Sequence, residues 1–164
     1  MFYLDLFRAL EHENIRYVLI GGLALNIHGV ERATMDIDLM LAMDTENLEA
    51  FCRAADSLGM TPLLPVTMKD FANPITLQRW VDERNLLSFS FRSQESSAPT
   101  VDILVHPKVA FDMAWARHLE KDLGSIHIRL AHIDDLIALK TGTGRQRDMS
   151  DVAALERLKT LRGE

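Results

Sequence analysis

The sequence predicts a single α/β domain, residues 1–164, built on a mixed β-sheet. Its 164 residues, 48% of them hydrophobic, suffice to bury a core of ordinary size without disulfides or structural metals. Apolar runs of strand length and amphipathic stretches of helical length follow one another, but not in the strict alternation of a βαβ protein. We therefore expect helices packed on a sheet that contains both parallel and antiparallel strand pairs.

The first sixty residues predict three helices and two strands. Glycine at 29 and 59 and the N-cap residue Asp44 mark helix ends. The second strand is apolar on both faces apart from two aspartates, which is typical of a central strand. The expected elements are a helix over 2–13, a strand over 17–20, a helix over 23–28, a strand over 35–43 and a helix between Asp44 and Gly59.

The rest of the chain predicts four further strands and three further helices. Residues 60–74 contain three prolines and are expected to be mostly connection, and the Ser-rich stretch 92–100 is expected to be an exposed loop. The expected elements are strands over 75–81 and 86–91 around a polar turn, a strand over 100–105, a helix over 109–116, a strand over 126–130, and helices over 134–141 and 148–161.

Composition narrows the classes of function. The chain has 18 Lys and Arg against 24 Asp and Glu, a net charge of -6, which argues against binding duplex DNA through a broad basic face. The one cysteine excludes an intramolecular disulfide and favours a reducing compartment. The N-terminus does not resemble a signal peptide, and no apolar run reaches the roughly 20 residues of a membrane span. A soluble, cytoplasmic protein without membrane contact is expected.

Asp36 and Asp38 are the first candidate site residues. Two residues apart on a strand, their side chains point the same way and their carboxylates can share divalent cations, while Met35, Ile37 and Leu39 point into the core. Two like charges buried close together are costly unless a metal or water compensates them. The alternative is a frayed or edge strand on which both aspartates are simply solvated.

Asp102 is a third acid, alone in the apolar run of residues 100–105. An isolated carboxylate in such a strand needs a reason, and a salt bridge to Arg32 or Arg92 is one alternative. If its strand lies beside that of Asp36 and Asp38, the three carboxylates form a magnesium site of the kind used in phosphoryl and nucleotidyl transfer. Asp102 could also accept the proton of an attacking hydroxyl.

Gly21 and Gly22 lie between the first strand and the following helix. Glycine allows the backbone to approach a ligand closely, and the N-terminal amides of the helix are a natural seat for the β- and γ-phosphates of a nucleotide. Tight strand-to-helix turns also use glycine for purely structural reasons. The position just ahead of the acid pair favours the functional interpretation.

These residues carry a family resemblance. The pattern Gly21-Gly22-x-Ala24-x-x-x-His28-Gly29, then Arg32-x-Thr34-x-Asp36-Ile37-Asp38, then Asp102, resembles the nucleotidyltransferase superfamily of the DNA polymerase β type. The small prokaryotic branch of AbiEii-like toxins and minimal nucleotidyltransferases is the most similar. The superfamily usually has Gly-Ser where this chain has Gly21-Gly22, so a phosphate contact from a serine hydroxyl is lost.

The resemblance implies a sheet of about five strands with flanking helices and a C-terminal helical pair. It also implies Mg²⁺-dependent transfer of a nucleoside monophosphate from an NTP. Metal ligands and catalytic residues would be Asp36, Asp38 and Asp102, with Lys140 as a further catalytic residue. The nucleotide-binding residues would be Gly21, Gly22, Arg32, Thr34, Arg147 and Asp148. Relatives of this branch act on tRNA ends or protein hydroxyls, and a cognate antitoxin is a possible partner.

The C-terminal residues also have simpler explanations. Lys140, Arg145 and Arg147 could neutralise a triphosphate, or the arginines could be a solvated connector. Asp148 and Asp151 stand where the N-cap and first-turn acids of the last helix belong.

Two functions from different classes are therefore expected. The first is a nucleotidyltransferase, with the toxin of a toxin–antitoxin pair as its expected role. The second is a non-catalytic module with a degenerate site that binds a nucleotide or a partner protein.

Overall fold

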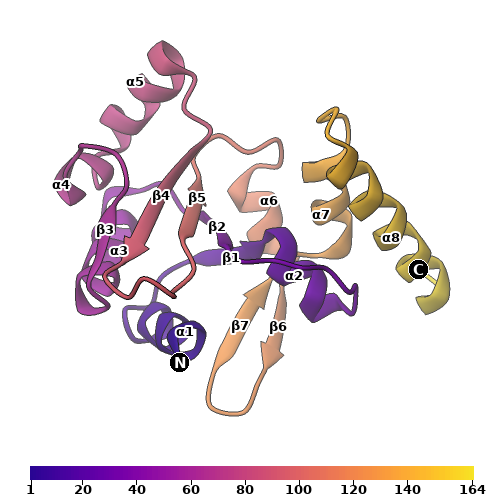
Figure 1. Cartoon of the computed structure of the whole chain (residues 1–164). Helices are drawn as coiled ribbons and strands as arrows, with labels where there is room; N and C mark the ends of the chain where they lie inside the picture. Colours follow the sequence, from indigo (N-terminus) through magenta and orange to yellow (C-terminus); the bar gives the residue numbers. More distant parts are fainter.

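The computed structural model describes residues 1–164 and contains one seven-stranded mixed sheet. The strand order is β3-β4-β5-β2-β1-β7-β6 (Figure 1). The strands are β1 (Tyr17–Ile20), β2 (Ile37–Leu41), β3 (Met60–Pro62), β4 (Ser88–Ser93), β5 (Val101–Leu104), β6 (Leu119–Asp122) and β7 (His127–Leu130). The predicted class is confirmed, with two strands more than the expected five.

The middle of the sheet combines both kinds of strand pair. Strand β2 is antiparallel to β1 and parallel to β5, and β1 is parallel to β7. The outer pairs, β3 with β4, β4 with β5, and β6 with β7, are all antiparallel. This arrangement places the strand of Asp36 and Asp38 next to the strand of Asp102, as the magnesium-site hypothesis requires.

Eight helices surround the sheet. They are α1 (Phe2–His12), α2 (Gly21–His28), α3 (Thr45–Ser57), α4 (Met68–Phe71), α5 (Pro74–Arg84), α6 (Phe111–Ala116), α7 (Ile133–Lys140) and α8 (Gln146–Arg162). Helix α2 packs on β1 and β2, and the C-terminal pair α7 and α8 packs together, with α7 also touching α2 (Figure 1). None of these helices is long and apolar enough to cross a bilayer.

The core fills the space between the sheet and the helices. A cluster of aromatic side chains joins α3, α4 and β4, where the ring of Phe71 lies 4.9 Å from that of Phe89 and 5.0 Å from that of Phe91. Asp44 caps α3 by accepting a hydrogen bond from the amide of Asn47, as predicted. Cys52 is half-buried on this helix and packs against the core.

The predicted strand over 75–81 is wrong, because these residues form helix α5. Asn73 accepts hydrogen bonds from the amides of Ile75 and Thr76, and Pro74 takes the first helical position, which is a strong start signal for a helix. Leu77 and Trp80, three residues apart, face the core, whereas Ile75 is 81% exposed. The apolar residues of this stretch alternate as in a strand, but the helix start signal of Asn73 and Pro74 outweighs that pattern.

Two short edge strands were not predicted. Strand β3 lies in the proline-containing stretch expected to be connection, which also contains helix α4. All four residues of β6 are exposed, so this strand has no apolar pattern to reveal it. Each is held by pairing with one neighbouring strand, β3 with the distant β4 and β6 with β7 in a hairpin.

Strand β2 is shorter than the expected 35–43. Ile37 and Leu39 are fully buried, as predicted, but Met35 is 77% exposed and Asp36 is also exposed. The interpretation of Met35 as a core residue is therefore wrong. Residues 32–36 instead form a loop that leads into β2 along the edge of a cavity.

Candidate active site

A cavity of about 910 Å³ lies between the central strands and the C-terminal helices α7 and α8. It is lined by residues of β2, β4, β5 and α2, by the loop that precedes β2, and by the segment joining α7 to α8. All ten predicted site residues line it, namely Gly21, Gly22, Arg32, Thr34, Asp36, Asp38, Asp102, Lys140, Arg147 and Asp148. Residues more than a hundred positions apart in the sequence therefore meet in one place.

The three predicted carboxylates gather at the starts of two adjacent strands, β2 and β5. Asp38 and Asp102 are directly paired in the parallel register of β2 and β5. Asp36 precedes β2 and accepts a hydrogen bond of 2.7 Å from the hydroxyl of Thr100, which precedes β5. The edge-strand alternative is wrong, since β2 is a central strand with a neighbour on each side, but β2 begins only at Ile37, so Asp36 lies in the preceding loop and is exposed.

The carboxylates repel one another. Burial, followed by the negative charges of Asp102 and Asp36, raises the pKa of Asp38 to about 6, although Lys140 and Arg32 act in the opposite direction. Burial also raises the pKa of Asp102, helped by the charge of Asp36 and opposed by a hydrogen bond from Ser90. The Lys and Arg side chains of the site therefore do not fully compensate its negative charge. A bound metal cation would lower the free-energy cost of keeping these buried carboxylates ionised.

The donor set fits Mg²⁺. Carboxylate oxygens are the ligands that this hard cation prefers, and it usually keeps several waters and is held by one or two carboxylates together with substrate phosphates. No three acidic, imidazole or thiolate groups stand close enough to enclose a metal on their own. An open set of carboxylates beside a phosphate seat is the arrangement expected for such a shared metal.

The two glycines bring the start of α2 against the carboxylates. Helix α2 begins at Gly21, two residues earlier than predicted, so both glycines belong to its first turn. Gly21 has a φ of +74°, and a Cβ atom there would lie 2.2 Å from Oδ2 of Asp38. Only glycine provides this conformation and this close approach without strain. The first amides of α2 therefore face the same space as Asp38.

Gly22 leaves room for two side chains of the following loop. A Cβ atom at this position would lie 2.4 Å from Nη1 of Arg32 and 2.8 Å from Oγ1 of Thr34. The volume that a serine side chain would need is thus filled by a guanidinium and a hydroxyl, both of which can donate to a phosphate. Arg32 and Thr34 can therefore supply the hydrogen-bond donor that the absent serine hydroxyl would have provided.

We expect Gly22→Ser to lower activity by about tenfold or more, although it introduces the residue that the superfamily usually carries. The new side chain must displace Arg32 or Thr34. Displacing Arg32 removes a charge-assisted hydrogen bond to the phosphate, and displacing Thr34 removes a neutral one. The measurement is the rate of nucleotide transfer by Gly22→Ser, by the matched variant Gly22→Ala and by wild type. A Gly22→Ser variant faster than wild type would contradict this account.

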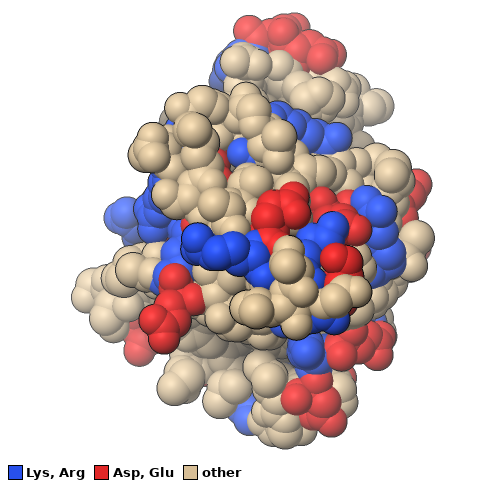
Figure 2. All heavy atoms as spheres, turned by 90° about the vertical axis from the view of Figure 1, so that its right-hand side faces the viewer, with Lys and Arg blue, Asp and Glu red and all other residues tan.

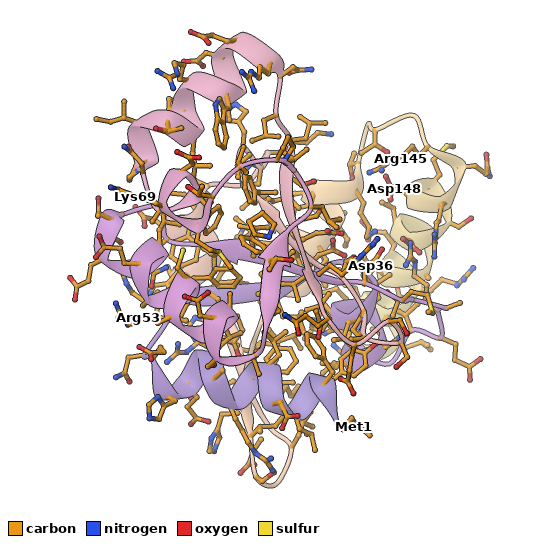
Figure 3. All side chains as sticks on the ribbon, turned by 60° about the vertical axis from the view of Figure 1, so that its left-hand side comes forward. Met1, Asp36, Arg53, Lys69, Arg145 and Asp148 are labelled. Carbon is orange, nitrogen blue, oxygen red and sulfur yellow. The ribbon has the colours of Figure 1, made fainter.

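Five cations lie on the other side of the cavity. They are Arg32, Lys108, Lys140, Arg145 and Arg147. On the face seen in Figure 2, Lys and Arg side chains gather beside Asp and Glu in the middle of the molecule. Figure 3 shows Asp36 at the end of the sheet on the same side as Arg145 and Asp148, which belong to the start of the C-terminal helix. The charged lining of the cavity thus comes from three parts of the chain, namely residues 32–38, residues 102–108 and residues 140–148.

Asp148 organises part of this positive half. It is buried and accepts hydrogen bonds from Lys140 at 3.3 Å, Thr143 at 2.7 Å and Arg145 at 2.8 Å. Burial raises the pKa of Asp148, but the hydrogen bond from Thr143 and the charges of Lys140 and Arg145 outweigh it, so the pKa lies below its usual value. Asp148 is therefore an ionised carboxylate that holds cations.

The N-cap interpretation of Asp148 is wrong, although this residue does lie in the first turn of α8. Helix α8 has Arg145 at its N-cap and no side chain that caps it. Asp151 lies beyond the first turn, and its oxygens accept from Arg32 at 2.8 Å and from Lys140 at 2.8 Å. Sequence spacing could not reveal this pairing, because Arg32 lies 119 positions away.

Arg147 and Lys108 are held by carbonyl oxygens. The Arg147 guanidinium donates to the carbonyl of Ala33 at 2.9 Å, and the Lys108 ammonium donates to that of Thr141 at 2.6 Å. Neither forms a salt bridge, so the positive charge of each remains available to a ligand. No sequence signal pointed to Lys108, which follows β5 in an ordinary loop.

Comparison with known protein families gives one match. A family model described as the nucleotidyl transferase AbiEii toxin of type IV toxin–antitoxin systems matches residues 4–162. No curated protein sequence matches the chain.

Solved structures of nucleotidyltransferases share the fold. The lincosamide antibiotic adenylyltransferase LnuA with bound lincomycin matches with a TM-score of 0.58 and 15% identity, covering 96% of this chain and 94% of that chain. ANT(2″)-Ia in complex with adenylyl-2″-tobramycin matches with a TM-score of 0.56 and 14% identity, covering 99% and 93%. An antigenic nucleotidyltransferase-like protein from Paracoccidioides brasiliensis matches with a TM-score of 0.57 and 13% identity, covering 97% and 75%.

Proposed function

Because this chain belongs to the AbiEii nucleotidyltransferase toxin family, we propose that it transfers a nucleoside monophosphate from an NTP to an RNA end or a protein hydroxyl. The proposal includes Mg²⁺ as the cofactor, a cytoplasmic location and a cognate antitoxin that restrains the enzyme. The observation that carries it is the meeting of three carboxylates, a glycine-led helix start and a set of cations in one cavity.

Asp36, Asp38 and Asp102 would hold the metal. Bound Mg²⁺ supplies charge neutralisation on the phosphates and lowers the barrier to displacement at phosphorus. The raised pKa of Asp38, caused first by burial and then by Asp102 and Asp36, supports a cation at this position. Asp36 is oriented by the Thr100 hydroxyl, which fixes one of its oxygens and leaves the other free.

The triphosphate would lie against the start of α2. The first turn of α2 has no side-chain cap, so its amides are available to a phosphate, and Arg32 and Thr34 flank Gly22. Lys140 approaches from α7 and would neutralise charge that develops on the leaving pyrophosphate. Asp148 would hold Lys140 and Arg145 rather than bind phosphate itself, since a carboxylate repels an anion.

Asp102 is the group proposed to activate the acceptor. Its pKa is raised by burial and by the charge of Asp36, which makes it a better proton acceptor than an ordinary aspartate. The acceptor oxygen would attack the α-phosphorus in line with the departing pyrophosphate, and the hydroxyl proton would move to the Asp102 carboxylate. The new bond is the phosphoester to the acceptor, and the bond broken is that between the α-phosphorus and the bridging oxygen.

Label transfer tests the proposal. The protein is incubated with each α-labelled NTP, Mg²⁺ and either total RNA or cell protein, in parallel with the Asp36→Asn/Asp38→Asn variant. Label that appears in one fraction with wild type and is lost in the variant would support the proposal and identify the acceptor class. Binding of NTP without labelling of either fraction would overturn it in favour of a non-catalytic module.

A further inference from the structure

Asp151 is buried behind the cavity and joins two of its cations. Its side chain is 7% exposed, Oδ1 accepts from Nε of Arg32 at 2.8 Å, and Oδ2 accepts from the ammonium of Lys140 at 2.8 Å. Arg32 and Lys140 line the cavity, whereas Asp151 does not. The carboxylate therefore touches the cations from the side away from any ligand.

One carboxylate thereby connects three separate parts of the chain. Arg32 lies in the loop before β2, Lys140 at the end of α7 and Asp151 on α8. Because each oxygen accepts from a different cation, the orientation of the carboxylate sets the positions of both. Removal of the Asp151 carboxylate would leave the partly buried charges of Arg32 and Lys140 without this compensation.

The two cations stand where the triphosphate is proposed to lie. Nη1 of Arg32 occupies the space in front of Gly22, at the start of α2. Lys140 reaches the same carboxylate from the end of α7 and also contacts Asp148 at 3.3 Å, so Asp151 is its nearer partner. With side-chain exposures of 15% and 12%, neither cation has much freedom to adopt another position.

We propose that Asp151 is a positioning residue that fixes Arg32 and Lys140 side by side, facing the NTP triphosphate. The inference rests on the nucleotidyltransferase function proposed above. Asp151 does not touch the substrate, and its contribution is to present two charges in a geometry that exists before the nucleotide arrives. Preorganised charges of this kind strengthen binding because they need no reordering when the ligand binds.

Asp151→Asn is the principal test. The amide has the same shape, but it offers one acceptor oxygen, and its NH₂ group faces the second cation, so the pair of contacts cannot persist. We expect the KM for NTP to rise about tenfold or more, while the KM for the acceptor changes less than about twofold. Binding of an NTP with a non-cleavable α,β-linkage, measured by calorimetry in Mg²⁺, should weaken by the same factor.

The matched control is Asp135→Asn. Asp135 is another fully buried acid, on the neighbouring helix α7, and its partner is Arg117, which does not line the cavity. This control should lower the melting temperature and leave the KM for NTP unchanged. It separates loss of a buried ion pair from loss of nucleotide positioning.

A variant cycle keeps the proposal testable if Asp151→Asn is unstable. Asp151→Asn added to Arg32→Gln/Lys140→Gln should cause no further loss of NTP affinity, because the cations that it positions are already absent. Asp151→Glu retains the charge with a longer side chain, and it should also weaken NTP binding while melting near wild type.

The outcomes are distinguishable. An NTP KM unchanged in Asp151→Asn, or the same further loss in the Arg32→Gln/Lys140→Gln background, overturns the positioning role while the enzyme function stands. Wild-type protein that neither binds nor transfers a nucleotide overturns the proposed function itself.

Discussion

We expect Asp38→Asn to lower nucleotidyl transfer by about 10³-fold or more, since it removes a carboxylate from the centre of the proposed metal site. Asp38 lies between the other parts of the site, against Gly21 and paired in register with Asp102. The amide is a poor ligand for a hard divalent cation and cannot compensate its charge. The measurement is the transfer rate at saturating NTP and Mg²⁺.

The same variant should be at least as stable as wild type at neutral pH. Burial and two neighbouring acids raise the pKa of Asp38 from 3.8 to about 6, so its ionised form destabilises the folded state above that pH. Asn carries no charge and avoids this cost. In the absence of divalent cations, the gain in melting temperature should be largest above pH 6 and should shrink as the pH falls from about 6 towards 3.8.

Asp122→Asn is the control for this pair of effects. Asp122 is an exposed acid on the edge strand β6, and it does not line the cavity. Its replacement should change neither activity nor the pH dependence of melting. An Asp38→Asn variant that loses stability and keeps its activity would contradict the proposed role of Asp38.

Gly21→Ala should lower activity by about 10²-fold, because a small displacement of a catalytic group is enough for such a loss. The added Cβ would lie 2.2 Å from Oδ2 and 2.8 Å from Cγ of Asp38, so the carboxylate or the start of α2 must move. The φ of +74° adds a conformational cost of about 1 kcal/mol to the folded state. Activity and melting temperature should both fall.

Gly124→Ala separates the two contributions. Gly124 has a similar φ of +82°, but a Cβ atom there would meet nothing within 4 Å. It should lose a comparable amount of stability and none of the activity. Equal activity losses in both variants would mean that backbone strain, rather than contact with Asp38, explains the effect of Gly21→Ala.

Much of the fold was predictable where the signal is local. The strand over 17–20, the helix capped by Asp44 and the apolar strand around Asp102 all follow from side-chain periodicity and capping residues. Helix α5 has the apolar alternation of a strand, and only Asn73 and Pro74 at its start indicate a helix. Strands β3 and β6 exist through pairing with a neighbour, and their own residues do not indicate it.

The negative part of the candidate site was predictable because its signal is also local. Asp36, Asp38 and Asp102 stand out because acids are costly in apolar strands, and adjacent strands bring them together. The positive half is different, because Arg32 meets Asp151 only after α8 has packed against the rest of the fold. Polar residues on a helix have many possible partners, so their spacing alone cannot identify the right one.

Pyrophosphate release and NTP binding, measured on the same samples of wild type and Asp102→Asn, test the central claim most directly. Each reaction contains Mg²⁺ with total RNA or cell protein as acceptor. The account predicts that both proteins bind NTP and that only wild type releases pyrophosphate. Wild-type protein that binds NTP and releases none with either acceptor, or an Asp102→Asn variant that releases it at the wild-type rate, would contradict it.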